Sequence, residues 1–109
     1  MDEYKIDVLE PAEEDLRDIC RYISDELSAP LTAQDVLENI VGTLAKLSYA
    51  PKGHPRVPDE HLAAKGYRMV SIKNYIALYT VNEQDKVVEV ERILYGRRDW
   101  MWILRKERP

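Results

Sequence analysis

The chain has 109 residues, of which 45% are apolar and 33% are charged. That apolar fraction excludes intrinsic disorder, and the length predicts a single domain over residues 1–109. No apolar run approaches the roughly 20 residues that a membrane-spanning helix needs, and no presequence pattern follows Met1, so we expect a cytoplasmic protein. A single cysteine, Cys20, excludes an internal disulfide and a cysteine-based zinc site.

Charge is distributed unevenly along the sequence, although the formal net charge is only −4. Residues 1–50 hold twelve acidic and four basic residues, whereas residues 51–109 hold eight acidic and twelve basic ones. The last thirteen residues contain five bases and two tryptophans: Arg97, Arg98, Arg105, Lys106, Arg108, Trp100 and Trp102. Such a segment is typical of a solvated tail or of a surface that binds a macromolecule, and the sequence leaves both open.

The first half of the chain predicts one strand followed by two helices. Residues 4–9 alternate between apolar and polar side chains, which is the period of a half-buried strand. A helix is predicted to begin at Pro11, because acidic residues crowd its first turn and apolar residues then recur at helical spacing. Pro30 is expected to end this helix and Thr32 to cap a second one, so that residues 28–31 join an antiparallel helical hairpin.

The second half predicts an irregular connection and three strands. Prolines and a glycine interrupt the connection, in which a short helical turn at residues 59–64 fits the pattern. Three runs rich in β-branched or aromatic residues are then predicted to form an antiparallel meander: residues 67–72, 75–82 and 86–95. If Lys73 and Asn74 form the tight turn of the first hairpin, Arg68 lies opposite Tyr79 on the same face of the sheet.

This order predicts an α+β fold of the type β-α-α-β-β-β. The economical arrangement packs the helical hairpin on one face of an antiparallel sheet and leaves the other face partly open. A short C-terminal helix from Asp99 onward is compatible with the sequence. Cys20 falls on the apolar stripe of the first helix and is expected to be a small core residue. Arg92 falls on an apolar face under strict alternation, so either the last strand bulges or the arginine pairs with an acidic residue.

The order of elements, the length and three local patterns resemble the RelE/ParE superfamily of toxins from bacterial type II toxin–antitoxin systems. The patterns are residues 3–16, EYKIDVLEPAEEDL; residues 66–79, GYRMVSIKNYIALY; and residues 91–99, ERILYGRRD. The resemblance covers about residues 3–104 and implies the fold described above. It also implies a small cytoplasmic toxin that a co-expressed antitoxin neutralises and that acts either on DNA gyrase or on mRNA at the ribosome.

Two departures from the ribonucleases of this superfamily favour the ParE-like branch, whose members bind a protein target, and hence DNA gyrase. Those ribonucleases resemble one another in a tyrosine or histidine for proton transfer shortly after the basic turn, at about the position of Leu104 here. The negative net charge also disfavours docking on ribosomal RNA. The alternative is a ribosome-dependent mRNA endoribonuclease of the RelE type, with Arg68, Tyr79, Arg97 and Arg98 as its candidate site, near which Tyr95 could also stand. A third interpretation is a degenerate, non-toxic interaction domain.

The resemblance and the composition together indicate four residues that would contact the target: Arg68, Arg97, Arg98 and Trp100. Arginine stays charged, and tryptophan beside arginine is frequent at the centre of interfaces. The expected protein partner is a cognate antitoxin, which could cover the open sheet face with an amphipathic helix or extend the sheet edge. No cofactor and no metal are expected, because His54 and His61 match no defined ligand spacing.

Overall fold

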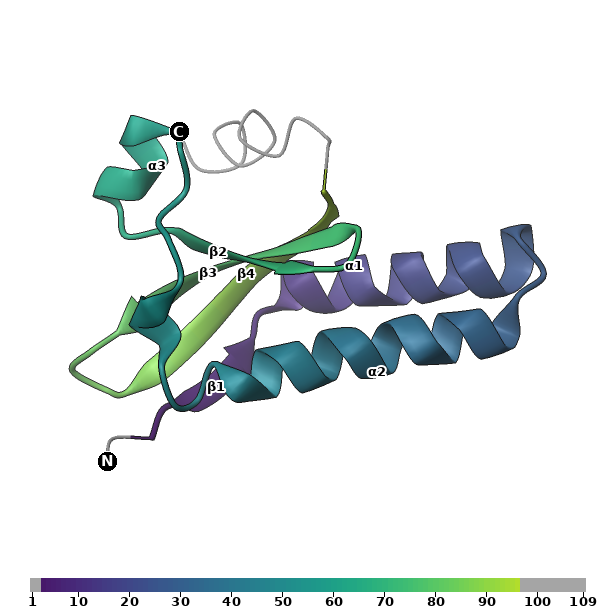
Figure 1. Cartoon of the computed structure of the whole chain (residues 1–109), viewed down its shortest axis with the longest axis horizontal. Helices are drawn as coiled ribbons and strands as arrows, with labels where there is room; N and C mark the ends of the chain where they lie inside the picture. Colours follow the sequence, from purple (N-terminus) through teal and green to yellow (C-terminus); the bar gives the residue numbers. More distant parts are fainter. Residues whose placement is uncertain (1–2, 97–109) are drawn as a thin grey trace.

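A computed structural model of the chain describes residues 3–96 (Figure 1). Its elements follow one another in this order: β1 (Lys5–Val8), α1 (Glu10–Arg21), the π-helical segment η1 (Tyr22–Glu26), α2 (Pro30–Lys46), the 3₁₀ turn η2 (Pro51–Gly53), α3 (Glu60–Ala64), β2 (Arg68–Ile72), β3 (Tyr75–Asn82) and β4 (Val87–Tyr95). The predicted succession of a strand, two helices and three strands is confirmed, as is the short helical turn. The predicted helix after Asp99 lies outside the described residues. None of the helices among residues 3–96 has the length and apolar character needed to span a membrane.

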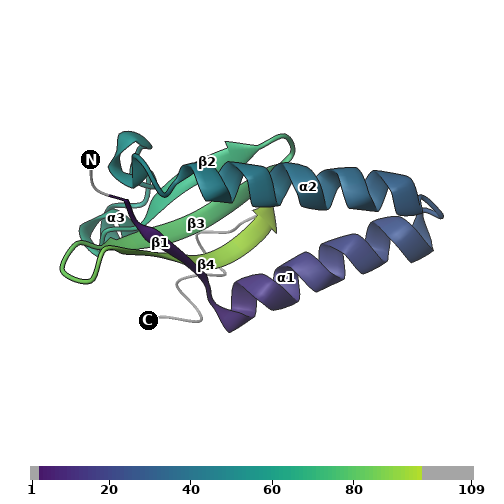
Figure 2. The same ribbon diagram turned by 90° about the horizontal axis from the view of Figure 1, so that it is seen from below.

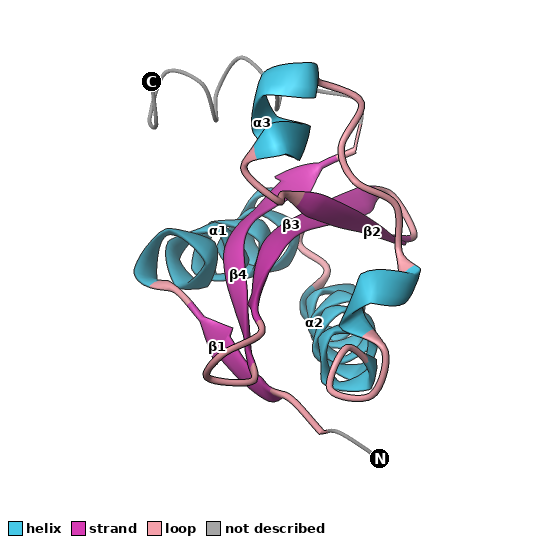
Figure 3. Cartoon of the chain, turned by 90° about the vertical axis from the view of Figure 1, so that its left-hand side faces the viewer, coloured by secondary structure: helices cyan, strands magenta, loops and turns pink. Residues whose placement is uncertain are grey.

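The four strands form one mixed sheet in the order β1-β4-β3-β2 (Figure 3). The predicted meander of β2, β3 and β4 is antiparallel throughout. The expectation of a wholly antiparallel sheet is wrong for β1, which runs parallel to β4 and pairs Lys5 with Val87 and Val8 with Val90. Parallel neighbours require a long connection, and here the helical hairpin and two further strands supply it. Alternation in residues 4–9 shows that a strand is half buried but carries no information about the direction of its neighbour.

The predicted register of the β2–β3 hairpin is confirmed. Arg68 pairs with Tyr79 and Ile72 with Tyr75, which leaves Lys73 and Asn74 as the turn. Lys73 has a φ of 56°, in the left-handed region that two-residue hairpin turns require.

Helices α1 and α2 form an antiparallel hairpin that covers one face of the sheet, and its far end extends past the strands (Figures 1 and 2). Two predictions about its connection are wrong. Pro30 begins α2 instead of ending the first helix, and the N-cap position is Ala29, with no side-chain hydrogen bond, instead of Thr32. Proline lacks an N–H and has a fixed φ, which suits the first turn of a helix as well as the residue beyond one. The hairpin is therefore tighter than predicted.

The main core lies between this hairpin and the sheet. Its fully buried side chains come from both helices, the segment that follows α2 and the two central strands: Ala12, Ile40, Leu47, Ala77, Tyr79, Val88, Val90 and Ile93. Cys20 is only partly buried, and this burial raises the pKa of its thiol above the ordinary value. Cys20 was expected in the core, and the structure places it at the margin of the core.

A second apolar cluster covers part of the opposite face. Leu62 of α3, together with Val57 and Tyr67, packs on side chains that point away from the helical hairpin: Ile76, Leu78 and Leu94. Asp59 caps α3 by accepting a hydrogen bond from the backbone N–H of Leu62 at 3.0 Å. In Figure 3, α3 lies above β2 and α2 below it. The face that the sequence left open is therefore closed in part by the irregular connection.

Arg92 satisfies both of the predicted alternatives. Leu78 pairs with Arg92 but the next residue of β3, Tyr79, pairs with Val90, so Glu91 is an extra, bulged residue. The bulge reverses the alternation, so that Ile93, instead of Arg92, joins the core between the sheet and the helices. The Arg92 guanidinium then pairs with the carboxylate of Asp15 in α1, with Nε 2.7 Å from Oδ2.

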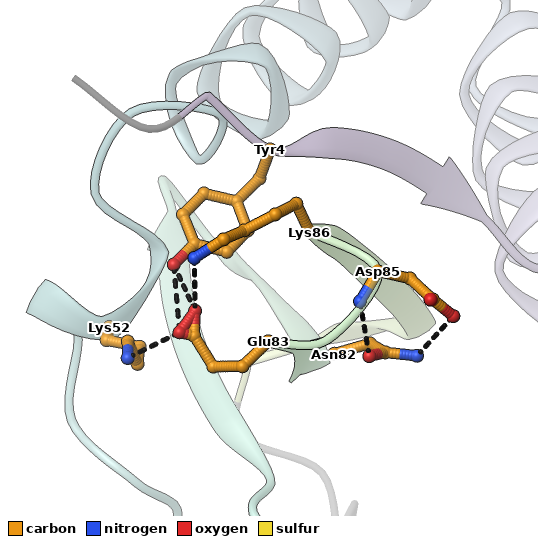
Figure 4. A network of polar contacts seen from close by, with 6 residues as sticks. All are labelled: Tyr4, Lys52, Asn82, Glu83, Asp85 and Lys86. Carbon is orange, nitrogen blue, oxygen red and sulfur yellow. Dashed lines mark hydrogen bonds and ion pairs between the residues drawn. The ribbon is translucent and has the colours of Figure 1, made fainter.

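A polar network ties the start of the chain to the β3–β4 turn and to η2 (Figure 4). The Tyr4 hydroxyl donates to the Glu83 carboxylate, which also accepts from Lys52 Nζ at 2.8 Å and from Lys86 Nζ at 3.4 Å. The Lys86 ammonium lies 5.1 Å from the centre of the Tyr4 ring. These hydrogen bonds, that of Lys52 above all and then that of Tyr4, lower the pKa of Glu83 to about 2. The network holds η2 beside the sheet.

Replacing Glu83 by glutamine is expected to make the free energy of unfolding depend less on pH at acidic pH. A carboxyl whose pKa falls from 4.5 when unfolded to about 2 when folded contributes stability above pH 4.5 and loses it as the pH falls toward 2. The free energy of unfolding of Glu83→Gln should therefore lie below that of the parent chain at pH 6, and the two should converge near pH 2. Urea titrations across this pH range measure the difference. Glu26→Gln, at an exposed position of η1, is the control, and an equal effect there would contradict the role of Glu83.

Candidate target-binding site

The residues that the sequence indicated fall in different places. Arg68 is the first residue of β2, and Tyr79, its partner across the hairpin, lies in the middle of β3. Arg97, Arg98 and Trp100 lie outside the described residues, which end at Gly96 immediately after β4. The geometry of the site can thus be followed up to the residue from which the basic segment starts.

Tyr79 is a core residue. Its side chain has no exposed surface, and its hydroxyl donates to the carbonyl oxygen of Pro51 in η2 at 2.5 Å. Burial raises the pKa of Tyr79 to about 12, against a smaller opposing effect of the Arg68 cation. A hydroxyl that is buried, protonated and already donating is poorly suited to exchange a proton with a substrate. The position of Tyr79 therefore weighs against the ribonuclease interpretation.

Tyr79→Phe separates a structural from a chemical role for this hydroxyl. The change leaves the buried carbonyl of Pro51 without its donor, which should lower the free energy of unfolding by about 1–3 kcal/mol. Growth arrest should persist at temperatures where the variant is folded, because a hydroxyl without exposed surface cannot contact a target. Thermal unfolding and a growth assay with the expressed chain measure both. Loss of arrest in a fully folded variant would restore Tyr79 as a functional residue.

Arg68 is half-buried and supports the irregular connection. Its Nη1 donates to the carbonyl oxygen of His54 at 2.7 Å. The backbone of this connection also pairs along the edge of β2, where Val57 N donates to Tyr67 O and Met69 N to Pro55 O, each at 3.1 Å. Arg68 thus holds the connection on the sheet through a carbonyl oxygen, a role that side-chain patterns do not reveal.

Among residues 3–96, no three or more His, Cys, Asp or Glu side chains gather as metal ligands would.

The start of the basic segment meets the tip of the β2–β3 hairpin. Gly96 N donates to Asn74 O at 2.6 Å, and the rings of Tyr75 and Tyr95 meet edge to face with centroids 5.6 Å apart. A Cβ on Gly96 would lie 2.9 Å from Asn74 O, so this approach requires glycine. Beside it lies an open cavity of about 310 Å³, which we call the hairpin-end cavity, lined by Ser71, Lys73, Asn74, Tyr75, Ile76, Tyr95 and Gly96.

Arg68 does not lie at the hairpin-end cavity. It pairs with Tyr79, four residues along β3 from Tyr75, which corresponds to about 13 Å at 3.3 Å per residue. Its side chain is engaged with His54, at the end of β2 that lies away from the hairpin turn. Of the four indicated residues, the structure thus describes Arg68, and it lies away from the hairpin-end cavity.

The hairpin-end cavity is lined by one cationic side chain and several neutral polar ones. Lys73 is the charged residue among those described in its lining, and both Lys73 and Asn74 are exposed. Burial, and to a smaller extent the neighbouring Tyr95, raise the pKa of Tyr75, so its hydroxyl is protonated at neutral pH. Lys73 and Asn74 were not singled out from sequence as contact residues. The predicted hairpin register could have found them, because it places the turn beside the end of the last strand.

A family model described as the ParE toxin of type II toxin–antitoxin systems, parDE, matches residues 6–100. The match therefore spans the helical hairpin, the sheet and the start of the basic segment. A search among curated proteins gave no match.

Several solved structures are similar to this chain. The chromosomal ParDE toxin–antitoxin system from P. aeruginosa contains a chain that matches 87% of this one over 98% of its own length, with 20% identity and a TM-score of 0.72. A mutant of the E. coli toxin RelE in the free state matches 97% of this chain over 97% of its own, with 14% identity and a TM-score of 0.67. The RelBE2 toxin–antitoxin complex from Mycobacterium tuberculosis matches 85% over 98%, with 17% identity and a TM-score of 0.65. At such identities the likeness shows a shared fold.

Proposed function

We propose that this chain, which belongs to the family of ParE toxins of type II toxin–antitoxin systems, arrests bacterial growth by binding DNA gyrase. It is the toxin component of such a system, and its partner is a cognate antitoxin. Inhibition through binding requires an accessible surface with anchoring side chains. It does not require a group that transfers protons. The proposed contact surface combines the hairpin-end cavity with Arg97, Arg98 and Trp100, which follow Gly96 directly.

One observation carries the choice of gyrase over mRNA. Of the two tyrosines that could have served in proton transfer beside Arg68, Tyr79 lies in the core with its hydroxyl bonded to Pro51, and Tyr95 pairs with Tyr75 at the end of the hairpin away from Arg68. Cleavage at a 2′-hydroxyl needs a base and an acid as well as cations, and arginines at neutral pH supply the cations alone. Lys73, the charged residue of the cavity lining, and Arg97 and Arg98, which follow Gly96 in sequence, suit recognition of acidic groups on a protein.

The cognate antitoxin would neutralise the toxin by covering this surface. β2 is an edge strand of the sheet, and among residues 3–96 the connection pairs with its first part, which leaves Ser71 and the turn beside the cavity exposed. An antitoxin segment added along this edge would end at Lys73 and Asn74. Acidic residues in that segment would complement the basic second half of the toxin.

The test is to express the chain alone and to assay its purified form with gyrase. Growth arrest with SOS induction, together with inhibition of DNA supercoiling by gyrase in vitro, is the expected result. Co-expression of the antitoxin should remove both effects. Codon-phased cuts in mRNA during arrest would overturn the proposal in favour of the ribonuclease, and absence of any arrest would leave an interaction domain without toxicity.

A further inference from the structure

The six residues before the basic segment are held from both sides. On one side, the Asp15 carboxylate of α1 accepts from Arg92 Nε at 2.7 Å, from Arg92 Nη2 at 3.0 Å and from the backbone N–H of Ile93 at 2.9 Å. On the other side, Asn74 accepts from the N–H of Gly96 at 2.6 Å. The course of residues 91–96 is thus set by two contacts from different parts of the chain.

Asp15 takes the place of a strand partner. The pairing of β1 with β4 ends at Val8 and Val90, and the N–H of Leu9 then donates to the Val90 carbonyl at 3.0 Å. Beyond that point the N–H of Ile93 bonds to the Asp15 side chain. The side chains of Asp15 and Arg92 are 14% and 16% exposed, so the ion pair is largely shielded from solvent and stronger than an exposed one.

The carboxylate binds immediately after the bulge at Glu91. A bulge inserts one extra residue into a strand, so its loss, or a slip of the pairing by one residue, would exchange the faces of all residues that follow. By binding the side chain of Arg92 and the backbone of Ile93 together, Asp15 fixes which side of the sheet each later residue of β4 faces. We call this choice the phase of the strand. In that phase Tyr95 meets Tyr75 and Gly96 reaches Asn74.

We propose that Asp15 is a positioning residue of the toxin: it fixes the course of β4 up to Gly96, from which the basic segment starts, and through it the contact with the target. This inference rests on the proposed function for its effect on toxicity, but not for its effect on the position of the segment. It also couples α1, on the helical side of the molecule, to the hairpin-end cavity.

The test is Asp15→Asn, with Asp18→Asn as its matched control on the same helix. The change at Asp15 keeps the size of the side chain but removes the charge that pairs with Arg92. Asp18 undergoes the same chemical change at an exposed site, where its side chain is 75% exposed and lies 3.9 Å from Arg21. The chain has two tryptophans, Trp100 and Trp102, and both lie in the segment, so intrinsic fluorescence reports on it specifically.

Asp15→Asn should shift the tryptophan emission maximum and change acrylamide quenching at temperatures where circular dichroism shows it folded, and should weaken growth arrest and gyrase inhibition at least tenfold. Asp18→Asn should leave all of these unchanged. If Asp15→Asn does not fold, Arg92→Lys, which keeps the charge but loses the two-point contact, replaces it. A folded variant with unchanged fluorescence overturns the inference. Altered fluorescence in a chain that never inhibits gyrase leaves the positioning intact and refutes the proposed function alone.

Discussion

Replacing Arg97 and Arg98 together by alanine is expected to abolish growth arrest while leaving the fold intact. Both residues follow Gly96, whose backbone is bonded to the hairpin turn, and both lie beyond the last strand of the sheet. An arginine at the centre of an interface contributes about 2 kcal/mol or more to binding, so loss of the pair corresponds to roughly a thousandfold weaker binding of the target. Gyrase supercoiling assays with purified variants, beside thermal unfolding of each variant, measure affinity and folding separately.

The control for this variant removes the same charge from the same segment. Arg105→Ala with Lys106→Ala also lowers the net charge by two but acts farther from the hairpin-end cavity along the sequence. This control should keep most of the inhibition. If both double variants lose it equally, general electrostatic attraction explains the activity and no specific contact at Arg97 and Arg98 is needed. If the first double variant retains full inhibition, the proposed contact surface is wrong.

Leu62→Ala is expected to give the largest loss of stability among single changes in the irregular connection. Leu62 has no exposed surface, and it packs on Ile76 and Leu78 of β3 on the sheet face opposite the helical hairpin. Truncating a buried leucine costs about 2–5 kcal/mol, because apolar contacts are lost and a cavity remains. For a domain of this size such a loss lowers the melting temperature by roughly 10 °C or more. Calorimetry or thermal circular dichroism measures it.

Leu31→Ala is the matched control, since the same side chain is 76% exposed there at the start of α2. Its free energy of unfolding should stay within about 0.5 kcal/mol of the parent value. Comparable losses at Leu62 and Leu31 would mean that α3 does not stabilise the sheet. The second cluster would then be a consequence of folding and not one of its causes.

Local sequence patterns predicted most of the fold, because turn geometry and the alternation of apolar residues determine where strands and helices form. The register of the β2–β3 hairpin followed from a two-residue turn, and the alternation around Arg92 anticipated both the bulge and the ion pair. The parallel pairing of β1 with β4 could not be predicted, because it joins residues from opposite ends of the chain and depends on how the helical hairpin packs. Pro30 was misplaced because proline is compatible with both sides of a helix boundary.

The candidate site was predicted less well than the fold. Arg68 and Tyr79 were placed together correctly, but the partners that define their roles are backbone carbonyls, of His54 and Pro51, which no side-chain pattern marks. Asp15 looked like one of many acids in the first turns of a helix. Asp15 is important because it contacts Arg92, which lies far away in the sequence and is brought close to it only by folding. Residue types indicated which side chains could donate, accept or carry a charge. Long-range contacts in the fold determined which of these groups are already engaged inside the molecule.

The pairing of Lys5 with Val87 also bears on when the protein acquires its shape. A sheet that joins the first strand to the last cannot be completed until nearly the whole chain has been synthesised, and contacts so distant in sequence slow folding. Any activity that depends on the completed sheet can therefore begin only when translation is nearly finished.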